Sequence, residues 1–154
     1  MGYVRRIFLG LIAAFFICPV SFAISIDEGM DFFNSFVKAA SSYDTNLLNF
    51  YDDNASIKRI IIKGPETFET KVISASAYKM KLKYYSKMAA VTKYKNLYTN
   101  LQFIPYGNDI KIKGYRKPST SNEKFEVEFV VGKNQNGKMV IKQDITHTKA
   151  AFLL

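Results

Sequence analysis

The chain has 154 residues, with 22 Lys and Arg against 13 Asp and Glu, and a formal net charge of +9 at neutral pH. This length suits one domain with its own hydrophobic core. One Cys and one His exclude an intramolecular disulfide and the usual metal-ligand sets, so we expect no metal and no other cofactor. The basic charge favours acidic partners, although a basic surface without a partner is the alternative.

Residues 1–23 have the pattern of a cleavable secretory signal peptide. Arg5-Arg6 form a short positive region, residues 7–20 are almost entirely apolar, and residues 21–23 (Ser-Phe-Ala) place small side chains where a signal peptidase reads. The apolar run is shorter than the roughly 20 residues that span a bilayer, although an uncleaved anchor is the alternative. We expect cleavage after Ala23, export by the Sec or the twin-arginine route, and a periplasmic or secreted domain at residues 24–154.

Two helical segments open this domain. Ser25 can cap a helix that begins at Ile26, with Glu28 as the acidic half of a capping box. Residues 45–51 favour a short second helix, and Asp52-Asp53-Asn54 are typical of a turn. The expected apolar stripe of the first helix consists of Ile26, Met30, Phe33, Val37 and Ala40, widened by Phe32 and Phe36.

A strand, a helix and a meander follow. Ser56–Lys63 is β-branched and predicts a strand that Gly64-Pro65 ends, and about Ser74–Ala90 predicts a third helix, with a strand as the alternative. From Tyr94 onward the apolar period is two, with a hairpin turn at Asn136-Gly137. The expected strands are Tyr94–Ile104, which Pro105 ends, Ile110–Arg116, Phe125–Phe129 and Met139–Thr148. The order predicts an α+β fold, with N-terminal helices packed on a curved antiparallel sheet.

One motif suggests a family. The segment from Leu48 to Ile57 (Leu-Asn-Phe-Tyr-Asp-Asp-Asn-Ala-Ser-Ile) resembles the NTF2-like superfamily, also called the SnoaL-like or cystatin-like cone fold, in which an apolar helix runs into Tyr-x-Asp-Asp-Ala and a strand. The resemblance covers roughly residues 26–148 and implies the cone, which carries many unrelated activities. In the ketosteroid-isomerase branch a general-base Asp follows this motif. That position falls on Arg59, and a guanidinium cannot abstract a proton at neutral pH.

Two residues are candidates for acid–base chemistry. His147 is the only histidine, and histidine titrates near neutral pH. Asp144 cannot assist it, because residues three apart on a strand point to opposite faces. Asp53, in the motif, is the second candidate. A surface histidine and a turn aspartate without chemistry are the alternatives.

Aromatic side chains predict a binding role. Ten Tyr and thirteen Phe can line an apolar cavity with room for a small lipid-like or aromatic ligand, or can simply fill the core. The candidate ligand-binding residues are Phe33, Phe36, Tyr51, Tyr78, Tyr85, Phe103 and Phe129.

Lysines of the third helix predict a second kind of surface. Lys79, Lys83 and Lys87 share one helical stripe beside Tyr84 and Tyr85, as in surfaces that bind anionic lipid or acidic protein. A solvated charged face is the alternative.

Together these features predict an exported, non-enzymatic NTF2-like binding module of the bacterial cell envelope. Its partner would be a small apolar ligand or an envelope protein, with an anionic lipid surface as a further partner and no nucleic acid. A homodimer through the sheet is also expected. The alternative function is a small hydro-lyase or isomerase of the SnoaL or ketosteroid-isomerase type.

Overall fold

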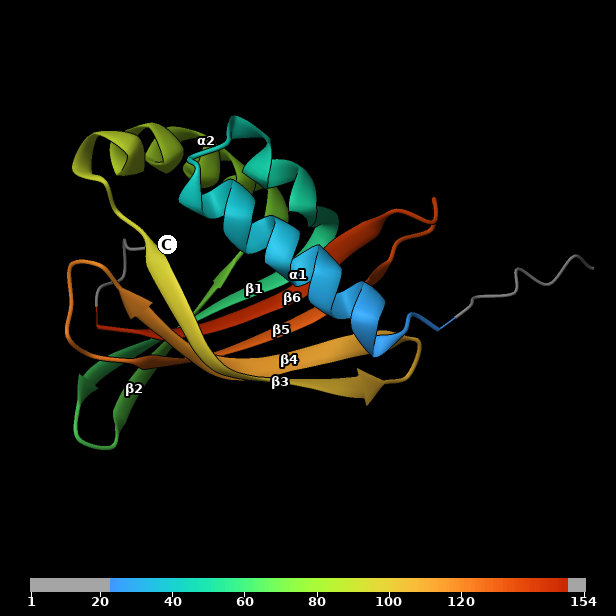
Figure 1. Cartoon of the computed structure of the whole chain (residues 1–154). Helices are drawn as coiled ribbons and strands as arrows, with labels where there is room; N and C mark the ends of the chain where they lie inside the picture. Colours follow the sequence, from blue (N-terminus) through green and yellow to red (C-terminus); the bar gives the residue numbers. More distant parts are fainter. Residues whose placement is uncertain (1–22, 150–154) are drawn as a thin grey trace, which may run out of the picture.

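The computed structural model describes residues 23–149, and the signal-peptide prediction lies almost wholly outside them. Helices α1 and α2 and a short 3-10 helix lie on one face of a curved six-stranded sheet, as Figure 1 shows. This arrangement confirms the predicted α+β architecture. Within the described residues, no helix combines the length and the apolar composition needed to cross a membrane.

Helix α1 (Ile26–Ser41) begins as predicted. The Ser25 hydroxyl accepts from the Glu28 amide at 3.1 Å, and the Glu28 carboxylate accepts from the Ser25 amide at 2.8 Å, which completes the capping box. The predicted stripe is rotated, because Ile26 and Met30 are exposed. Gly29 faces the sheet instead, where an added Cβ would lie 3.1 Å from Ile110. The buried face is Gly29, Phe33, Phe36 and Ala39.

The predicted turn after the second helix is wrong. The 3-10 helix η1 (Thr45–Phe50) leads directly into strand β1 (Tyr51–Gly64), which contains Asp52, Asp53 and Asn54. Asn54 donates its amide to Asp52 Oδ1 at 2.8 Å, and the pairing of β1 with β6 shifts register between Tyr51 and Ser56. A bulge therefore absorbs these turn-forming residues while the buried side chain of Tyr51 holds the strand in place.

Strand β2 (Thr67–Ile73) is an element that the sequence analysis did not predict. It pairs antiparallel with β1 across a turn at Pro65-Glu66, and its large side chains Phe68 and Val72 are exposed. Helix α2 (Ala75–Thr92) confirms the third predicted helix, with Ser74 as its N-cap and Lys93 in the left-handed conformation at its end.

The last four strands form the predicted meander. They are β3 (Asn96–Tyr106), β4 (Asp109–Pro118), β5 (Phe125–Lys133) and β6 (Met139–Thr148). Pro105 does not end β3, because β3 is an edge strand and an edge tolerates a residue without an amide proton. The sheet order is β2-β1-β6-β5-β4-β3. Strands β1 and β6 pair in parallel, so the sheet is mixed rather than antiparallel throughout.

Candidate functional site

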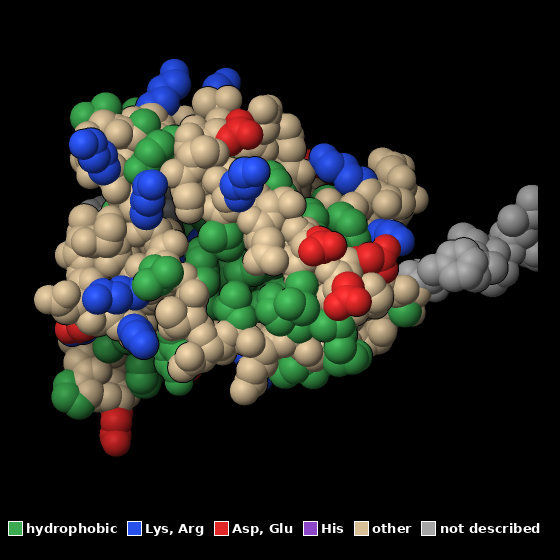
Figure 2. Space-filling model, viewed as in Figure 1, with side chains coloured by type: hydrophobic (Ala, Val, Ile, Leu, Met, Phe, Trp, Pro, Cys, Tyr) green, Lys and Arg blue, Asp and Glu red, His purple; other side chains and the backbone are tan. Residues whose placement is uncertain are grey.

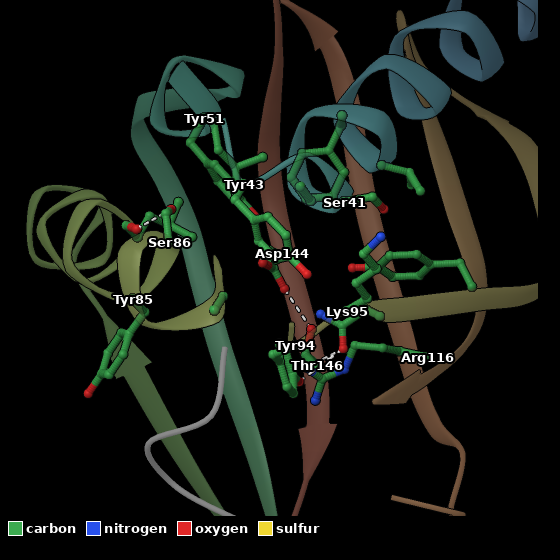
Figure 3. Close-up of a pocket in the computed structure, with 18 of the residues that line it drawn as sticks. Ser41, Tyr43, Tyr51, Tyr85, Ser86, Tyr94, Lys95, Arg116, Asp144 and Thr146 are labelled. Atoms are coloured by element: carbon green, nitrogen blue, oxygen red, sulfur yellow. Dashed lines mark hydrogen bonds between the residues drawn. The ribbon is translucent and has the colours of Figure 1, made fainter. Parts of the chain in front are cut away.

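A small cavity lies between the helices and the sheet. Its volume is about 80 Å³, and its walls come from α1, η1 and α2 on one side and from β1, β3, β4, β5 and β6 on the other. Figure 3 shows Asp144 and Thr146 on β6, with Tyr51 and Tyr43 on one side and Arg116 and Lys95 on the other. The polar and aromatic residues of its walls include Tyr51, Arg59, Tyr78, Tyr85, Tyr94, Lys95, Asn96, Tyr98, Arg116, Asp144 and Thr146.

A buried ion pair forms one wall of this cavity. Arg59 of β1 and Asp144 of β6 are 3% and 2% exposed. The guanidinium donates in a bidentate manner, from Nη1 to Oδ1 at 2.9 Å and from Nη2 to Oδ2 at 3.1 Å. The parallel pairing of β1 and β6 brings these two residues together. Such a fork-to-carboxylate pair fixes both side chains in orientation as well as in position.

Three hydroxyl groups complete the hydrogen bonding of Asp144. Thr146 donates to Oδ1 at 2.8 Å, and Tyr51 donates to Oδ2 at 2.9 Å. Tyr78 donates to Oδ2 at 3.4 Å and accepts from Arg59 Nη2 at 2.7 Å. Both carboxylate oxygens therefore already accept several hydrogen bonds, and the carboxylate has little capacity left to take a proton from a substrate.

The protonation states follow from burial and from this pairing. Burial raises the pKa of Tyr51 well above its ordinary value, and the neighbouring Asp144 carboxylate raises it further. Burial also raises the pKa of Tyr78. Burial opposes the charge of Arg59, but the Asp144 carboxylate outweighs it, and the pKa of Arg59 is higher than usual. At neutral pH Arg59 thus remains charged, and Tyr51 and Tyr78 remain neutral.

A second cation lies at the β4 side of the cavity. Arg116 is 2% exposed, and its Nη1 donates to Asn96 Oδ1 at 3.5 Å. Tyr94 donates to the same oxygen at 3.0 Å, and burial raises the pKa of Tyr94. Lys95 also lines the cavity, with its Nζ 5.8 Å from the centre of the Tyr43 ring. Among the described residues that line the cavity, the charged groups are three cations and one carboxylate.

The aromatic candidates divide into two groups. Phe36, Tyr51, Tyr78, Tyr85 and Phe129 line the cavity. In Figure 3 the ring of Tyr85 points away from Asp144. Phe33 and Phe103 instead pack in the core, with the Phe33 ring centre 6.3 Å from that of Phe103 and 5.2 Å from that of Phe129.

Neither acid–base candidate lines the cavity. His147 lies on the opposite face of β6, as the spacing argument requires, with its Nδ1 4.0 Å from the Glu126 carboxylate. Asp53 is exposed on β1, where it accepts from Lys79. In the part of the chain that the structure describes, no group of three or more His, Cys, Asp or Glu is placed to hold a metal ion.

The candidate lysines also divide. Lys79 pairs with Asp53 and is mostly covered, whereas Lys83 and Lys87 are exposed on α2. The three therefore differ in exposure, and only Lys83 and Lys87 are open to solvent.

The buried pair of Arg59 and Asp144 was not predicted from the sequence. One signal was available for Arg59, because Ile57, Arg59 and Ile61 share one face of a strand, and both isoleucines belong to a core face. A charged residue on such a face needs a buried partner. The partner Asp144 stands 85 positions away, and its identity follows only from the strand order.

Comparison with known proteins identifies the fold. No protein-family model and no curated protein matches the sequence. An NTF2-like protein with a cystatin-like fold from Novosphingobium aromaticivorans has 8% identity and a TM-score of 0.57, over 81% of this chain and 82% of that chain. An NTF2-like protein from Cytophaga hutchinsonii has 10% identity and a TM-score of 0.58, over 81% and 98%.

A third solved structure carries an enzyme name. It is described as a "putative ketosteroid isomerase" and comes from Shewanella frigidimarina, with 13% identity and a TM-score of 0.57 over 80% of this chain and 98% of that chain. These similarities confirm that the chain has the NTF2-like fold that its motif predicts.

Proposed function

We propose that this protein is an exported NTF2-like binding module of the bacterial cell envelope that holds a small ligand in its cavity and catalyses no reaction on it. The observation that carries the proposal is the state of Asp144. Its two oxygens accept from Arg59, Thr146, Tyr51 and Tyr78 at 2.8–3.4 Å, so the carboxylate serves as a fixed structural charge.

The size and charge of the cavity narrow the ligand class. A volume of about 80 Å³ is well below the roughly 300–1,000 Å³ of sites that enclose drug-sized ligands. The ligand is therefore a small molecule or one end of a larger one. Phe36 and Leu82 offer apolar walls, while Arg59, Arg116 and Lys95 outnumber Asp144. This balance favours a small aromatic or aliphatic body that carries one carboxylate group.

The enzyme alternative rests on the similarity to a structure named as an isomerase. An isomerase or hydro-lyase of this type needs a free base that can reach its substrate. Among the described residues that line the cavity, Asp144 is the only carboxylate, and its oxygens are already engaged. Arg59 stands at the position that the family motif gives to the base. These two facts favour binding over catalysis.

Ligand-observed NMR with the full chain tests the proposal. We expect benzoate and hexanoate to bind, and the neutral amides of the same acids to bind about tenfold or more weakly, because an amide loses the charge-assisted hydrogen bond. Ala89→Leu places extra volume in the cavity and should abolish binding. The neighbouring Ala90 is exposed, so Ala90→Leu is the matched control and should bind normally.

Two results would contradict this function. Equal binding of acids and amides would show that the cations of the cavity do not select a carboxylate. Equal binding by the two leucine variants would show that the ligand does not bind in the cavity. Turnover of a ketosteroid or hydroxy-acid substrate by the full chain would establish the enzyme alternative. Export is tested separately by cell fractionation, with Ile24 expected as the first residue of the envelope form.

A further inference from the structure

Helix α2 is apolar on two opposite faces. Its inner face packs on the core through Ala75, Tyr78 and Leu82. Its outer face carries a row of four large apolar side chains at spacings of four, four and three residues, which places them on one side of a helix. These side chains, named here the outer ridge, are Met80, Tyr84, Met88 and Val91, which are 70%, 64%, 48% and 84% exposed.

Lysines flank the outer ridge on both sides. Lys83 and Lys87 follow one side of it and Lys81 lies on the other, and all three are exposed. The sequence of α2 contains four Lys and no Asp or Glu. In Figure 2 blue Lys and Arg side chains gather over α2 and the start of β3, with green hydrophobic side chains between them, while red acidic side chains gather over the first half of α1.

We infer that α2 docks the protein on an anionic lipid bilayer, with the outer ridge in the head-group region. In this region the apolar side chains of the outer ridge are removed from water, and the ring of Tyr84 suits the boundary between water and hydrocarbon. Lysine stems extend along apolar surface while their ammonium groups reach the lipid phosphates. Isolated exposed apolar residues are ordinary, but a continuous row along more than three turns is a feature of an interaction surface.

The shape and charge of this surface favour lipid over a protein partner. The outer ridge is convex along one helix, which suits a soft planar interface, whereas a protein would need a matching groove. The lysines lie on both sides of the outer ridge, and α2 contains no acidic residue. A single negatively charged surface can therefore attract all of these lysines at once. The membrane surface does not depend on the ligand cavity, since the outer ridge and the cavity lie on opposite faces of α2.

Tryptophan fluorescence can locate the contact, because the chain contains no Trp. The Tyr84→Trp variant of the full chain is mixed with vesicles of phosphatidylcholine that contain about 30% phosphatidylglycerol, so that the vesicle surface is negatively charged. We expect a blue shift of the tryptophan emission of this variant and quenching of that emission by brominated lipid. The control is Tyr106→Trp, at an exposed position near the β3–β4 turn and away from α2, which should show neither change.

Charge variants test the lysines. K83Q/K87Q removes two charges beside the outer ridge, and K124Q/K138Q removes two exposed charges elsewhere. We expect K83Q/K87Q to weaken vesicle binding by about tenfold, since each lysine near an anionic surface contributes on the order of a fewfold to affinity. The control pair should retain most of the binding. Vesicles of pure phosphatidylcholine should bind all forms weakly.

Several results would overturn the inference. The absence of quenching in the Tyr84→Trp variant, quenching that is equal in the two tryptophan variants, or equal loss of affinity in the two lysine pairs would each exclude bilayer contact through α2. Vesicle binding through the N-terminal apolar segment alone would appear as binding of the Tyr84→Trp variant without quenching of its emission, and that result would also overturn the inference. Unchanged circular dichroism and thermal unfolding in every variant ensure that these differences report binding.

Discussion

At the residue scale, the cavity depends on one buried ion pair. Arg59 and Asp144 are almost fully buried, and each supplies the charge that balances the other. A buried ion pair contributes little net stability compared with a well-packed apolar pair, but removal of one partner leaves an uncompensated charge in the protein interior. Replacement of either Arg59 or Asp144 alone should therefore be poorly tolerated.

Asp144→Asn should strongly destabilise the protein. The substitution keeps the shape of the side chain but leaves the Arg59 guanidinium buried without its carboxylate, and we expect the free energy of unfolding to fall by about 3–5 kcal/mol. Urea denaturation at neutral pH measures this change. The double variant Arg59→Met with Asp144→Leu should recover part of the loss, because it removes both buried charges.

An exposed carboxylate provides the control. Glu126→Gln on β5 changes one exposed side chain and should alter the free energy of unfolding by no more than about 0.5 kcal/mol. If Asp144→Asn had an equally small effect, the ion pair would not be buried as described.

At the element scale, α1 positions part of the cavity wall, and its first turn is stabilised locally. Glu28 accepts from the Ser25 amide and also pairs with Lys133 at 3.3 Å. The Ser25 amide lowers the pKa of Glu28 most, and Lys133 lowers it further. The start of α1 thus joins a helix cap to the end of strand β5 through a single carboxylate.

This linkage predicts a pH dependence. A carboxyl group whose pKa is lowered in the folded state stabilises the protein at any pH above its ordinary pKa of 4.5. This stabilisation is lost as the pH falls through the pKa of the carboxyl group in the folded protein. We expect the melting temperature of wild type to decrease below about pH 4.5, and that of Glu28→Gln to decrease less steeply. Thermal unfolding from neutral pH to about pH 3 measures both curves.

The control for this prediction lies in the β1–β2 turn. Glu66→Gln removes an exposed carboxylate outside any helix cap and should follow the wild-type curve. Parallel curves for Glu28→Gln and wild type would show that the capping box does not account for the acid sensitivity.

At the scale of the whole molecule, apolar surface also remains on the face of the sheet that the helices leave open. In the β1–β2 pair, Ile57 and Arg59 face the core, so the alternate positions face away from it. Ile62 is paired with Phe68 there, and Phe68 and Val72 are among the exposed large apolar side chains. An open apolar sheet face of this kind favours association with a second copy of the chain.

We therefore expect a homodimer that Phe68→Ser with Val72→Ser converts to a monomer. Both substitutions remove exposed apolar surface and should leave the fold intact. Light scattering coupled to size exclusion, over a range of protein concentrations, measures the molar mass. The same double substitution at Met80 and Met88 on α2 is the control and should leave the dimer intact, whereas a wild type that is monomeric at every concentration would contradict the prediction.

Signals within short stretches of the sequence predict most of the helices and strands. A capping box and helical periodicity predicted α1, and helix-forming composition predicted η1 and α2. Alternation of apolar residues predicted the strands of the meander, because each of these signals lies within a short stretch of chain. The motif from Tyr51 to Ala55 also led to the correct fold, although the same residues form a bulged strand rather than a turn.

The candidate site depends on how the strands and helices are arranged in space. Alternation shows which side of a strand is apolar, but it does not show which strand will lie beside it. The parallel pairing of β1 with β6 brings Arg59 to Asp144, and the packing of α2 turns Met80, Tyr84, Met88 and Val91 outward while Tyr78 and Leu82 face the core. Both outcomes depend on contacts between residues far apart in the chain, because the whole core determines which strands pair and which faces are buried.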